Sequence, residues 1–506
     1  MKSTFYNILS NTLARLWALG ISVVLLPIYI DMIGMEAYGL VGFYTMLLGS
    51  LAILDLGLSS TLNREMARSL AVGTPAQSIK NLVYSLELIY WVVGILIGLG
   101  VVLFAPLIAN NWVKAGELSV RQITNSVMLM GGIIAFQWPQ SIYTGGLMGL
   151  QKQVPFNIAN VILSTLKSVG VIIVLKFYSS SIETFFAWQI IISFLSACVL
   201  RYLLWKFAPK SSENAVFSSE ELKKIWRFAA GMTGIGLATF CLSQIDKVLL
   251  SKLLPLKEYG YYTLAWTVGT GIMLIVGVLG SVLLPKLTEI VARGNQQEIT
   301  TNYHRFSCLV ASLVMPIGIL LCLFSQEIIW MWTQNIQTTR TIWLAVSILT
   351  VGSICNAIMN VPYYLLLAYG KTKFTFYQNI IASIIVVPLL FLWTAKWGLT
   401  GATLVWFSVN LGYNIISLPL MHRFLLKGEL YKVYVNDIGV ALLCSLVVIG
   451  LARIMLDTNR SQLFQGFYFV ITLILTYVSI VFFSKEYKAY SAQLFQKIIP
   501  KLTNDK

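Results

Sequence analysis

Six charged side chains inside the long apolar stretches of this 506-residue chain are candidates for functional residues. A charge at bilayer depth costs at least ~2.5–3.5 kcal/mol, so such residues face protein or water and mark substrate or ion pathways. The sequence therefore predicts two kinds of functional residue. The predicted substrate-binding cations are Arg15, Lys167 and Lys247, and the predicted charged partners or coupling-ion ligands are Asp55, Glu87 and Asp246.

Each of these residues also has a structural interpretation. Arg15 lies near the start of an apolar stretch, where a long side chain can reach the membrane surface. Asp55 and Glu87 could serve as structural ion-pair or packing partners. Lys167 is the hardest to explain in this way, because it falls near the middle of its stretch and must face protein or water.

The adjacent pair Asp246 and Lys247 raises a separate question. Neighbouring side chains on a helix point ~100° apart, so we expect that these two cannot simply pair with each other. One of them should find another partner or face a cavity. A buried pair between a lysine and Glu87 or Asp246 remains the competing explanation for both intramembrane lysines.

The apolar stretches themselves predict the fold. Hydrophobic residues make up 57% of the chain and charged residues 11%, against ~25% charged in a soluble domain. A membrane-spanning helix needs ~20 apolar residues. The sequence thus predicts an all-α integral membrane protein with about 14 transmembrane helices near 12–34, 38–60, 82–108, 122–149, 154–177, 183–207, 226–254, 260–284, 303–330, 340–368, 374–396, 399–425, 433–456 and 463–484.

The distribution of Lys and Arg predicts the orientation of these helices. Most of the 36 basic residues fall on one side when both termini and every second loop are placed together. The positive-inside rule then puts both termini in the cytoplasm of a multi-pass protein. The net charge of +16 is explained by this loop charge. No basic run is interleaved with aromatic residues, so nucleic acid is not expected as a partner.

An internal repeat predicts the domain organisation. At an offset of about 221 residues, Tyr38-Gly39 aligns with Tyr259-Gly260 and Gly149 with Gly370, together with six apolar stretches on six. The predicted parts are an N-terminal six-helix lobe at 1–207, a cytoplasmic linker at 208–225, a C-terminal six-helix lobe at 226–425, and two additional helices with a cytoplasmic tail at 426–506. Two parallel lobes around a central cavity favour alternating access.

Other residues support a transporter and not an enzyme. Gly20 and Pro27 are hinge candidates in the first helix, although a fixed kink would use the same proline. No nucleotide-binding, zinc-protease or nucleophile-elbow motif is present. The six cysteines and two histidines have no metal-ligand spacing, so neither a metal site nor a cofactor is predicted.

Three stretches carry a family resemblance. They are Tyr38-Gly39 with Leu-Asp-Leu-Gly-Leu-Ser at 54–59, Asp246-Lys247 with Glu258-Tyr259-Gly260-Tyr261-Tyr262, and Gly370-Lys371-Thr372-Lys373. With the layout of six, six and two helices, the chain resembles the polysaccharide-transport branch of the multidrug/oligosaccharidyl-lipid/polysaccharide exporter superfamily, which includes the O-antigen flippases. The resemblance covers essentially the whole chain.

The resemblance implies a flippase of the bacterial inner membrane. Its substrate would be an oligosaccharide repeat unit on polyprenyl pyrophosphate, moved to the outer leaflet for O-antigen, capsule or exopolysaccharide assembly. Membrane lipid and other polysaccharide-assembly proteins are the further expected partners. Cations inside the spans would then offset the pyrophosphate charge. The alternatives are a cation-coupled multidrug exporter of the same superfamily, which would favour acidic residues in its cavity, and a membrane polymerase of the same pathway.

Overall fold

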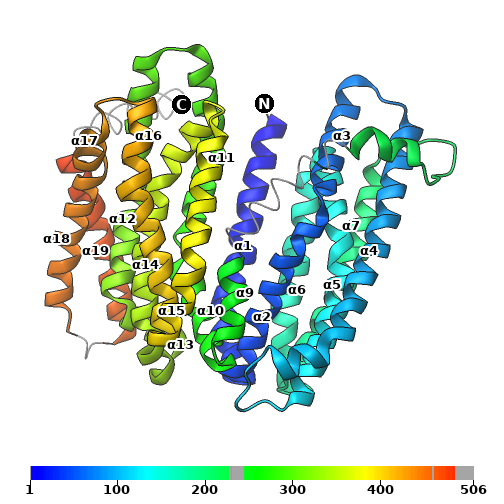
Figure 1. Ribbon diagram of the computed structural model, residues 1–506, viewed down its shortest axis with the longest axis horizontal. Helices are drawn as coiled ribbons and strands as arrows, with labels where there is room; N and C mark the ends of the chain where they lie inside the picture. The colour runs from blue at the N-terminus through cyan, green and yellow to red at the C-terminus, as the bar shows by residue number, and fades with distance from the viewer. Residues whose placement is uncertain (1, 227–229, 231–243, 458–460, 485–506) are drawn as a thin grey trace, which may run out of the picture. The chain divides into compact units, whose positions relative to one another are not determined.

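The computed structural model describes residues 2–226, 230, 244–457 and 461–484 as an all-helical protein (Figure 1). The prediction of an all-α membrane fold is therefore confirmed. The chain groups into two compact units, Met1–Gly260 and Tyr261–Lys506. This division falls C-terminal to the predicted linker at 208–225, and the four predicted parts remain predictions.

The first unit is built around a central helix. Its elements are α1 (Lys2–Ile33), α2 (Met35–Leu51), η1 (Ala52–Asp55), α3 (Leu58–Val72), α4 (Ala76–Asn111), α5 (Val120–Gly149), α6 (Gln153–Phe177), α7 (Ile182–Phe207), α9 (Ile245–Leu253) and the start of α10 (Leu256–Gly269). Helix α5 packs against α2, α3, α4, α6 and α7. A capping box between Ser119 and Gln122 fixes its first turn.

The second unit repeats this order and adds two helices. Its elements are the rest of α10, α11 (Met273–Arg293), α12 (Gln296–Leu323), α13 (Ser325–Thr333), α14 (Ile336–Ala368), α15 (Thr372–Gly412), η2 (Tyr413–Ser417), α16 (Leu418–Leu425), α17 (Leu430–Lys432), η3 (Val433–Gly439), α18 (Val440–Met455) and α19 (Gln462–Phe483). The last two, α18 and α19, pack side by side against α12 (Figure 1).

Among the described residues, 11 helices are long and apolar enough to cross a membrane, against the 14 predicted. Three causes account for the difference. The predicted span at 226–254 lies largely outside the described residues. Spans 374–396 and 399–425 run on as one helix past a turn at Gly398, whose φ is +53°. The span at 122–149 forms α5 but is less apolar, because its polar and small residues pack among neighbouring helices.

The span predicted near 38–60 is found at Met35–Asp55 and ends before the predicted boundary. The chain breaks between α2 and α3, where Leu56 and Gly57 take left-handed conformations with φ of +51° and +68°. The predicted span at 260–284 is also interrupted, between α10 and α11. Irregular backbone at membrane depth needs protein or a cavity to satisfy its polar groups. The hydropathy of both stretches is continuous, which is why sequence patterning missed the breaks.

The helix boundaries reproduce the internal repeat. At an offset of 221, the start of α2 at Met35 corresponds to the start of α10 at Leu256, and the end of α3 at Val72 corresponds to the end of α11 at Arg293. Both interrupted segments therefore occupy equivalent places in the two halves. Because the break occurs in both halves, it is a feature of the repeated fold and not of one local sequence.

The repeated Tyr-Gly pairs meet each other. A Cβ placed on Gly39 would lie 2.3 Å from the carbonyl oxygen of Leu256, and one on Gly260 would lie 2.5 Å from the carbonyl oxygen of Met35. Because the obstructing atoms are backbone, a side chain at either position would force the two helix starts apart. Glycine is required at both positions for close approach and not for its backbone angles.

We expect Gly39→Ala to destabilise the protein by about 1–3 kcal/mol, the usual cost of overpacking a tight contact. The readout is the thermal midpoint of the purified protein in detergent. The control is Gly100→Ala on α4, where a Cβ would meet no atom within 4 Å. Equal midpoints for the two variants would show that the glycine contact does not hold the helices together.

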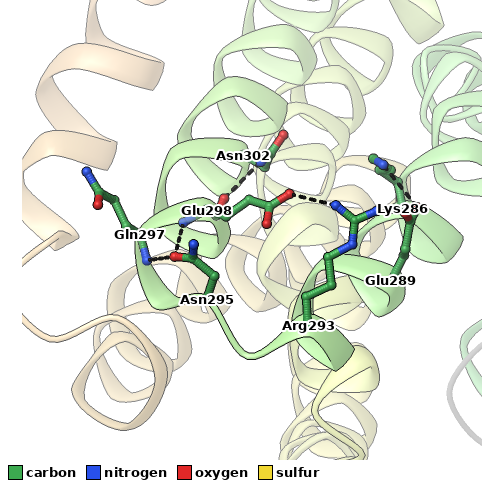
Figure 2. Close-up of polar contacts among 7 residues, drawn as sticks. All are labelled: Lys286, Glu289, Arg293, Asn295, Gln297, Glu298 and Asn302. Carbon is green, nitrogen blue, oxygen red and sulfur yellow. Dashed lines mark hydrogen bonds and ion pairs between the residues drawn. The ribbon is translucent and has the colours of Figure 1, made fainter.

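Two connections fix the ends of the units. The linker packs on the first unit, where Gln77 donates to the carbonyl oxygen of Asn214 at 2.8 Å and Ile225 joins the core of α3 and α4. In the second unit, the turn between α11 and α12 carries ion pairs of Lys286 with Glu289 and of Arg293 with Glu289 and Glu298 (Figure 2). The basic residues of that turn are thus already neutralised.

Candidate functional site

Glu87 is a buried carboxylate with a complete set of donors. Its side chain on α4 accepts from the Arg201 guanidinium at 2.5 Å, the Tyr143 hydroxyl at 2.7 Å and the Trp205 indole at 2.9 Å. The residue is 5% exposed. This network ties α4 to α5 and α7. It gives Glu87 a cation partner that the sequence did not suggest, in place of a lysine.

Asp55 lies at the break between α2 and α3. Its carboxylate accepts from the hydroxyls of Ser59 and Tyr90, each at 2.7 Å, and of Ser141 at 3.3 Å. No Lys or Arg contacts it within the described part of the chain. Hydroxyl donors thus satisfy this carboxylate at the helix break in place of a basic side chain.

The prediction that Asp246 and Lys247 cannot pair was wrong. The Lys247 ammonium lies 3.3 Å from both carboxylate oxygens of Asp246, in the first turn of α9. The 100° between the two positions does not prevent contact, because the four-carbon lysine side chain can bend back toward its neighbour. Both side chains are largely buried, so the pair removes most of its own charge from this region.

Lys167 differs from the other predicted residues. It lies half-buried on α6, and no acceptor contacts its ammonium group among the residues that the structure describes. Leu163 and Val171, which lie one helical turn before and after Lys167 on the same face of α6, are buried. A cation at this depth requires water or an anion from outside the protein to balance it.

Further polar groups lie where α6 meets α7. The Trp188 indole on α7 donates to the Leu166 carbonyl at 3.2 Å, and Lys167 and Gln189 are the next residues along the two helices. Gln189 is buried, and its side-chain oxygen has no hydrogen-bond partner in the described residues.

Tyr44 and Gln137 form a further polar contact near Gln189. The Tyr44 hydroxyl on α2 donates to Gln137 on α5 at 2.9 Å, and the Tyr44 ring packs on Phe186, within one turn of Gln189. We refer to Tyr44, Gln137, Lys167 and Gln189 as the polar layer of the first unit. The Lys167 ammonium can donate to an anionic group, and the Gln189 oxygen can accept from a ligand hydroxyl.

Helix α1 contacts the turn of α6 that carries Lys167. The Trp17 indole donates to the Thr165 hydroxyl and the Tyr29 hydroxyl donates to the Ser168 carbonyl, both at 2.8 Å. These two contacts enclose the hinge candidates Gly20 and Pro27 on α1. A Cβ on Gly20 would meet no atom within 4 Å, so packing does not explain this glycine.

Arg15 lies on an exposed part of α1. Its guanidinium has no carboxylate partner in the described residues. The structure therefore does not join Arg15 to Lys167 through a shared contact, and the role of each of the predicted site residues remains a prediction.

Sequence reasoning missed Glu36. This carboxylate at the start of α2 is 2% exposed and accepts from the backbone amides of Gly116 and Glu117, both at 2.7 Å, and of Leu118. It orders the loop between α4 and α5. Glu36 lies at the end of an apolar stretch, where charged residues at the membrane surface are common, so the sequence did not single it out. Its contact with the loop depends on the tertiary structure.

The second half of the repeat lacks these charges. At the offset of 221, Asp55 corresponds to Val276, Glu87 to Cys308 and Lys167 to Pro388. Gln189 corresponds to Asn410, whose amide is fully engaged with Asn356 and the Trp406 carbonyl. The second unit instead joins α12 to η3 and to the residue before α17 through His304, which contacts Asp437 at 2.6 Å and Glu429 at 3.2 Å. Among the described residues, the predicted site residues without an ion-pair partner at membrane depth, Asp55 and Lys167, thus belong to the first half.

Comparisons with known proteins agree with this architecture. A family model described as polysaccharide biosynthesis protein matches residues 2–291, and the MatE model matches residues 234–392. A putative O-antigen transporter of Shigella flexneri is 22% identical over 377 residues, which cover 74% of this chain and 87% of that protein.

Solved structures share the fold. The lipid II flippase MurJ in an inward closed conformation superposes with a TM-score of 0.68 at 15% identity, over 98% of this chain and 100% of that one. An inward-facing multidrug resistance transporter of the MATE family gives a TM-score of 0.61 at 16% identity, over 81% and 94% of the two chains. These relatives are named as transporters or flippases, which agrees with the predicted transport class. The chain therefore belongs to the polysaccharide biosynthesis protein family, in the polysaccharide-transport branch of the multidrug/oligosaccharidyl-lipid/polysaccharide exporter superfamily.

Proposed function

We propose that this protein flips a polyprenyl-pyrophosphate-linked oligosaccharide repeat unit from the cytoplasmic to the outer leaflet of the bacterial inner membrane. The likeness to a putative O-antigen transporter and the family match support a lipid-linked saccharide as substrate. A sugar-pyrophosphate head cannot cross hydrocarbon, so the protein must offer it a hydrated path while the tail stays in lipid.

The observation that carries the proposal is the unpaired cation of Lys167 on α6. In the first unit, Glu87 pairs with Arg201 and Asp246 with Lys247. Lys167 has no carboxylate partner in the described residues. The free cation suits the phosphate oxygens of an anionic head, and the unsatisfied side-chain oxygen of Gln189 can accept from a sugar hydroxyl. Arg15, exposed on α1, would supply further positive charge at the predicted cytoplasmic mouth.

The alternative is a cation-coupled multidrug exporter. The MatE match over residues 234–392 favours it, and Asp55 would be its carboxylate, since no Lys or Arg contacts Asp55 in the described part of the chain. The three hydroxyls around Asp55 leave little room for a drug-sized cation but would suit a coupling ion. Asp55 can therefore serve either function, whereas Lys167 would repel a cationic drug.

The proposal predicts the phenotype of a deletion strain. Loss of the gene should cause a polyprenyl-pyrophosphate oligosaccharide to accumulate on the cytoplasmic face, measured by lipid extraction and mass spectrometry. Surface polysaccharide should fall in parallel, and a plasmid copy should restore it. Normal lipid-linked intermediates together with increased sensitivity to cationic drugs would favour the exporter instead.

A further inference from the structure

We propose that the second unit binds one anionic phospholipid in a groove between the two halves of α15 and the adjoining η2 and α16. This inference does not depend on the proposed substrate. The groove has a volume of about 360 Å³, which roughly a dozen methylene-sized groups would fill. Its lining includes Tyr377, Gln378, Ile381, Ile385, Gly412 and Ser417.

The deep part of the groove is mostly apolar, with Ser408 as a polar lining residue, and it is open. Ile381, Ile385 and Ile416 are 58%, 48% and 62% exposed, although they line a concave surface. In a bilayer these side chains contact lipid tails. A concave apolar channel along a transmembrane helix pair holds one hydrocarbon chain in a defined place, because it contacts the chain on more than one side.

Four cations lie near the ends of the two helices whose residues Phe374 and Leu420 line the groove. Lys371 and Lys373 lie at the start of α15, and Arg423 and Lys427 lie at the end of α16. All four are exposed, and none has a carboxylate partner in the described residues. Basic residues at the cytoplasmic ends of transmembrane helices attract anionic headgroups at ~1 kcal/mol each. The predicted topology places this end at the cytoplasmic leaflet.

These cations differ from the neighbouring basic residues. Gln296 at the start of α12 donates to the Leu425 carbonyl at 3.3 Å, so the α11–α12 turn lies at the same end of the unit. There Lys286 and Arg293 are paired with Glu289 and Glu298 (Figure 2). The hydrogen bond from Lys432 holds the pKa of nearby Glu429 below its usual range, and Glu429 contacts Lys432 and His304. The charges at the groove mouth are left for another anion.

A polar level between the cations and the apolar channel identifies the ligand class. Gln378 and Ser417 both line the groove, and neither side chain has a hydrogen-bond partner in the described part of the second unit. They lie five and six residues along their helices from Lys373 and Arg423, about 7–9 Å at helical rise. The interfacial region of one leaflet is ~5–8 Å thick, so this level coincides with the glycerol esters of a phospholipid.

The order of cations, then polar side chains, then apolar side chains along the groove distinguishes a phospholipid from a polyprenyl phosphate. A phospholipid carries ester carbonyl acceptors below its phosphate, which Gln378 and Ser417 can donate to. In a polyprenyl phosphate the hydrocarbon follows the phosphate directly, and both polar groups would face hydrocarbon at a cost. The groove therefore fits an anionic phospholipid such as phosphatidylglycerol.

Gly412 allows the groove to be filled without disturbing the protein. It lines the cavity in a helical conformation, with φ of −58°, and a Cβ there would meet no atom within 4 Å. Gly412→Leu should thus occupy the channel and fold normally. The matched control is Gly450→Leu on α18, where a Cβ would also meet no atom within 4 Å.

The test is native mass spectrometry of delipidated full-length protein titrated with phosphatidylglycerol. We expect Gly412→Leu to weaken the tightest binding event at least tenfold, and the double variant Lys373→Gln/Arg423→Gln to weaken it about tenfold. Gly450→Leu and the charge-matched Lys286→Gln/Arg293→Gln should bind as wild type does. Removing three surface ion pairs should leave that control folded.

Three outcomes would overturn the proposal. The first is wild-type affinity in Gly412→Leu. The second is equal affinity for phosphatidylcholine, which would show that the cations do not recognise the headgroup. The third is stronger binding of a polyprenyl phosphate than of phosphatidylglycerol, with loss of that binding in Gly412→Leu. The test measures lipid binding and not flipping, so a negative result would not bear on the proposed function.

Discussion

Lys167→Gln should reduce the flipping of a lipid-linked oligosaccharide in proteoliposomes about 30- to 100-fold, because it removes a charged hydrogen bond of ~2–3 kcal/mol to the anionic head. The protein should fold as well as wild type or better. No acceptor contacts Lys167 in the described residues, so the neutral glutamine relieves an unpaired charge at membrane depth. Loss of function combined with unchanged or raised stability is typical of a functional residue.

Two controls separate charge from shape. Lys167→Arg keeps the cation and should retain part of the activity. Lys176→Gln removes an exposed cation from the last turn of the same helix and should flip as wild type does. If Lys167→Gln instead lowers the thermal midpoint while each folded molecule still flips substrate normally, Lys167 is a structural residue and the assignment is wrong.

Glu87→Ala should cause the largest loss of stability among the predicted site residues, about 3 kcal/mol. The substitution leaves the Tyr143 hydroxyl and the Trp205 indole without their buried acceptor and frees the Arg201 guanidinium. Each hydrogen bond to a charged group contributes ~1.5–3 kcal/mol, but the losses do not add. The expected measurement is a lower thermal midpoint and a lower yield of monodisperse protein.

The control is Glu65→Ala, whose carboxylate forms only long ion pairs of 3.8 and 3.9 Å with Arg64 and Arg68. Such pairs contribute less than ~1 kcal/mol. A double-mutant cycle of Glu87→Gln with Arg201→Gln should show a coupling of at least ~1 kcal/mol. Zero coupling would exclude Arg201 as the partner. If folded Glu87→Ala molecules fail to flip substrate, this result would support Glu87 as a coupling-ion ligand.

Hydropathy and charge counting predicted most of the fold because they depend on composition over ~20 residues. They found the apolar stretches and the repeat, and the helix boundaries follow the same offset. They could not find the break at Leu56 and Gly57, because two left-handed residues interrupt a helix without changing its hydropathy. The glycine in Leu-Asp-Leu-Gly was the available signal.

The site was predicted only in part, because depth can be read from the sequence but partners cannot. The sequence placed Lys167 and Glu87 inside spans. It could not show that Arg201, at the end of α7, reaches back to Glu87. It also wrongly separated Asp246 from Lys247, since helical angles describe Cβ directions and not the reach of a lysine. Gln189 was one of many amides, and only its missing partner distinguishes it.

The contact between the two Tyr-Gly pairs has a consequence for the history of the chain. Gly39 meets Leu256, and Gly260 meets Met35. At the offset of 221, Gly39 corresponds to Gly260 and Met35 corresponds to Leu256, so the two contacts are equivalent. Reciprocity of this kind defines an isologous interface, the type that two identical subunits form about a two-fold axis. A single ancestral half-chain would have made the same contact as a homodimer before its gene was duplicated and fused. Co-expressed, separately encoded halves should therefore find each other through it.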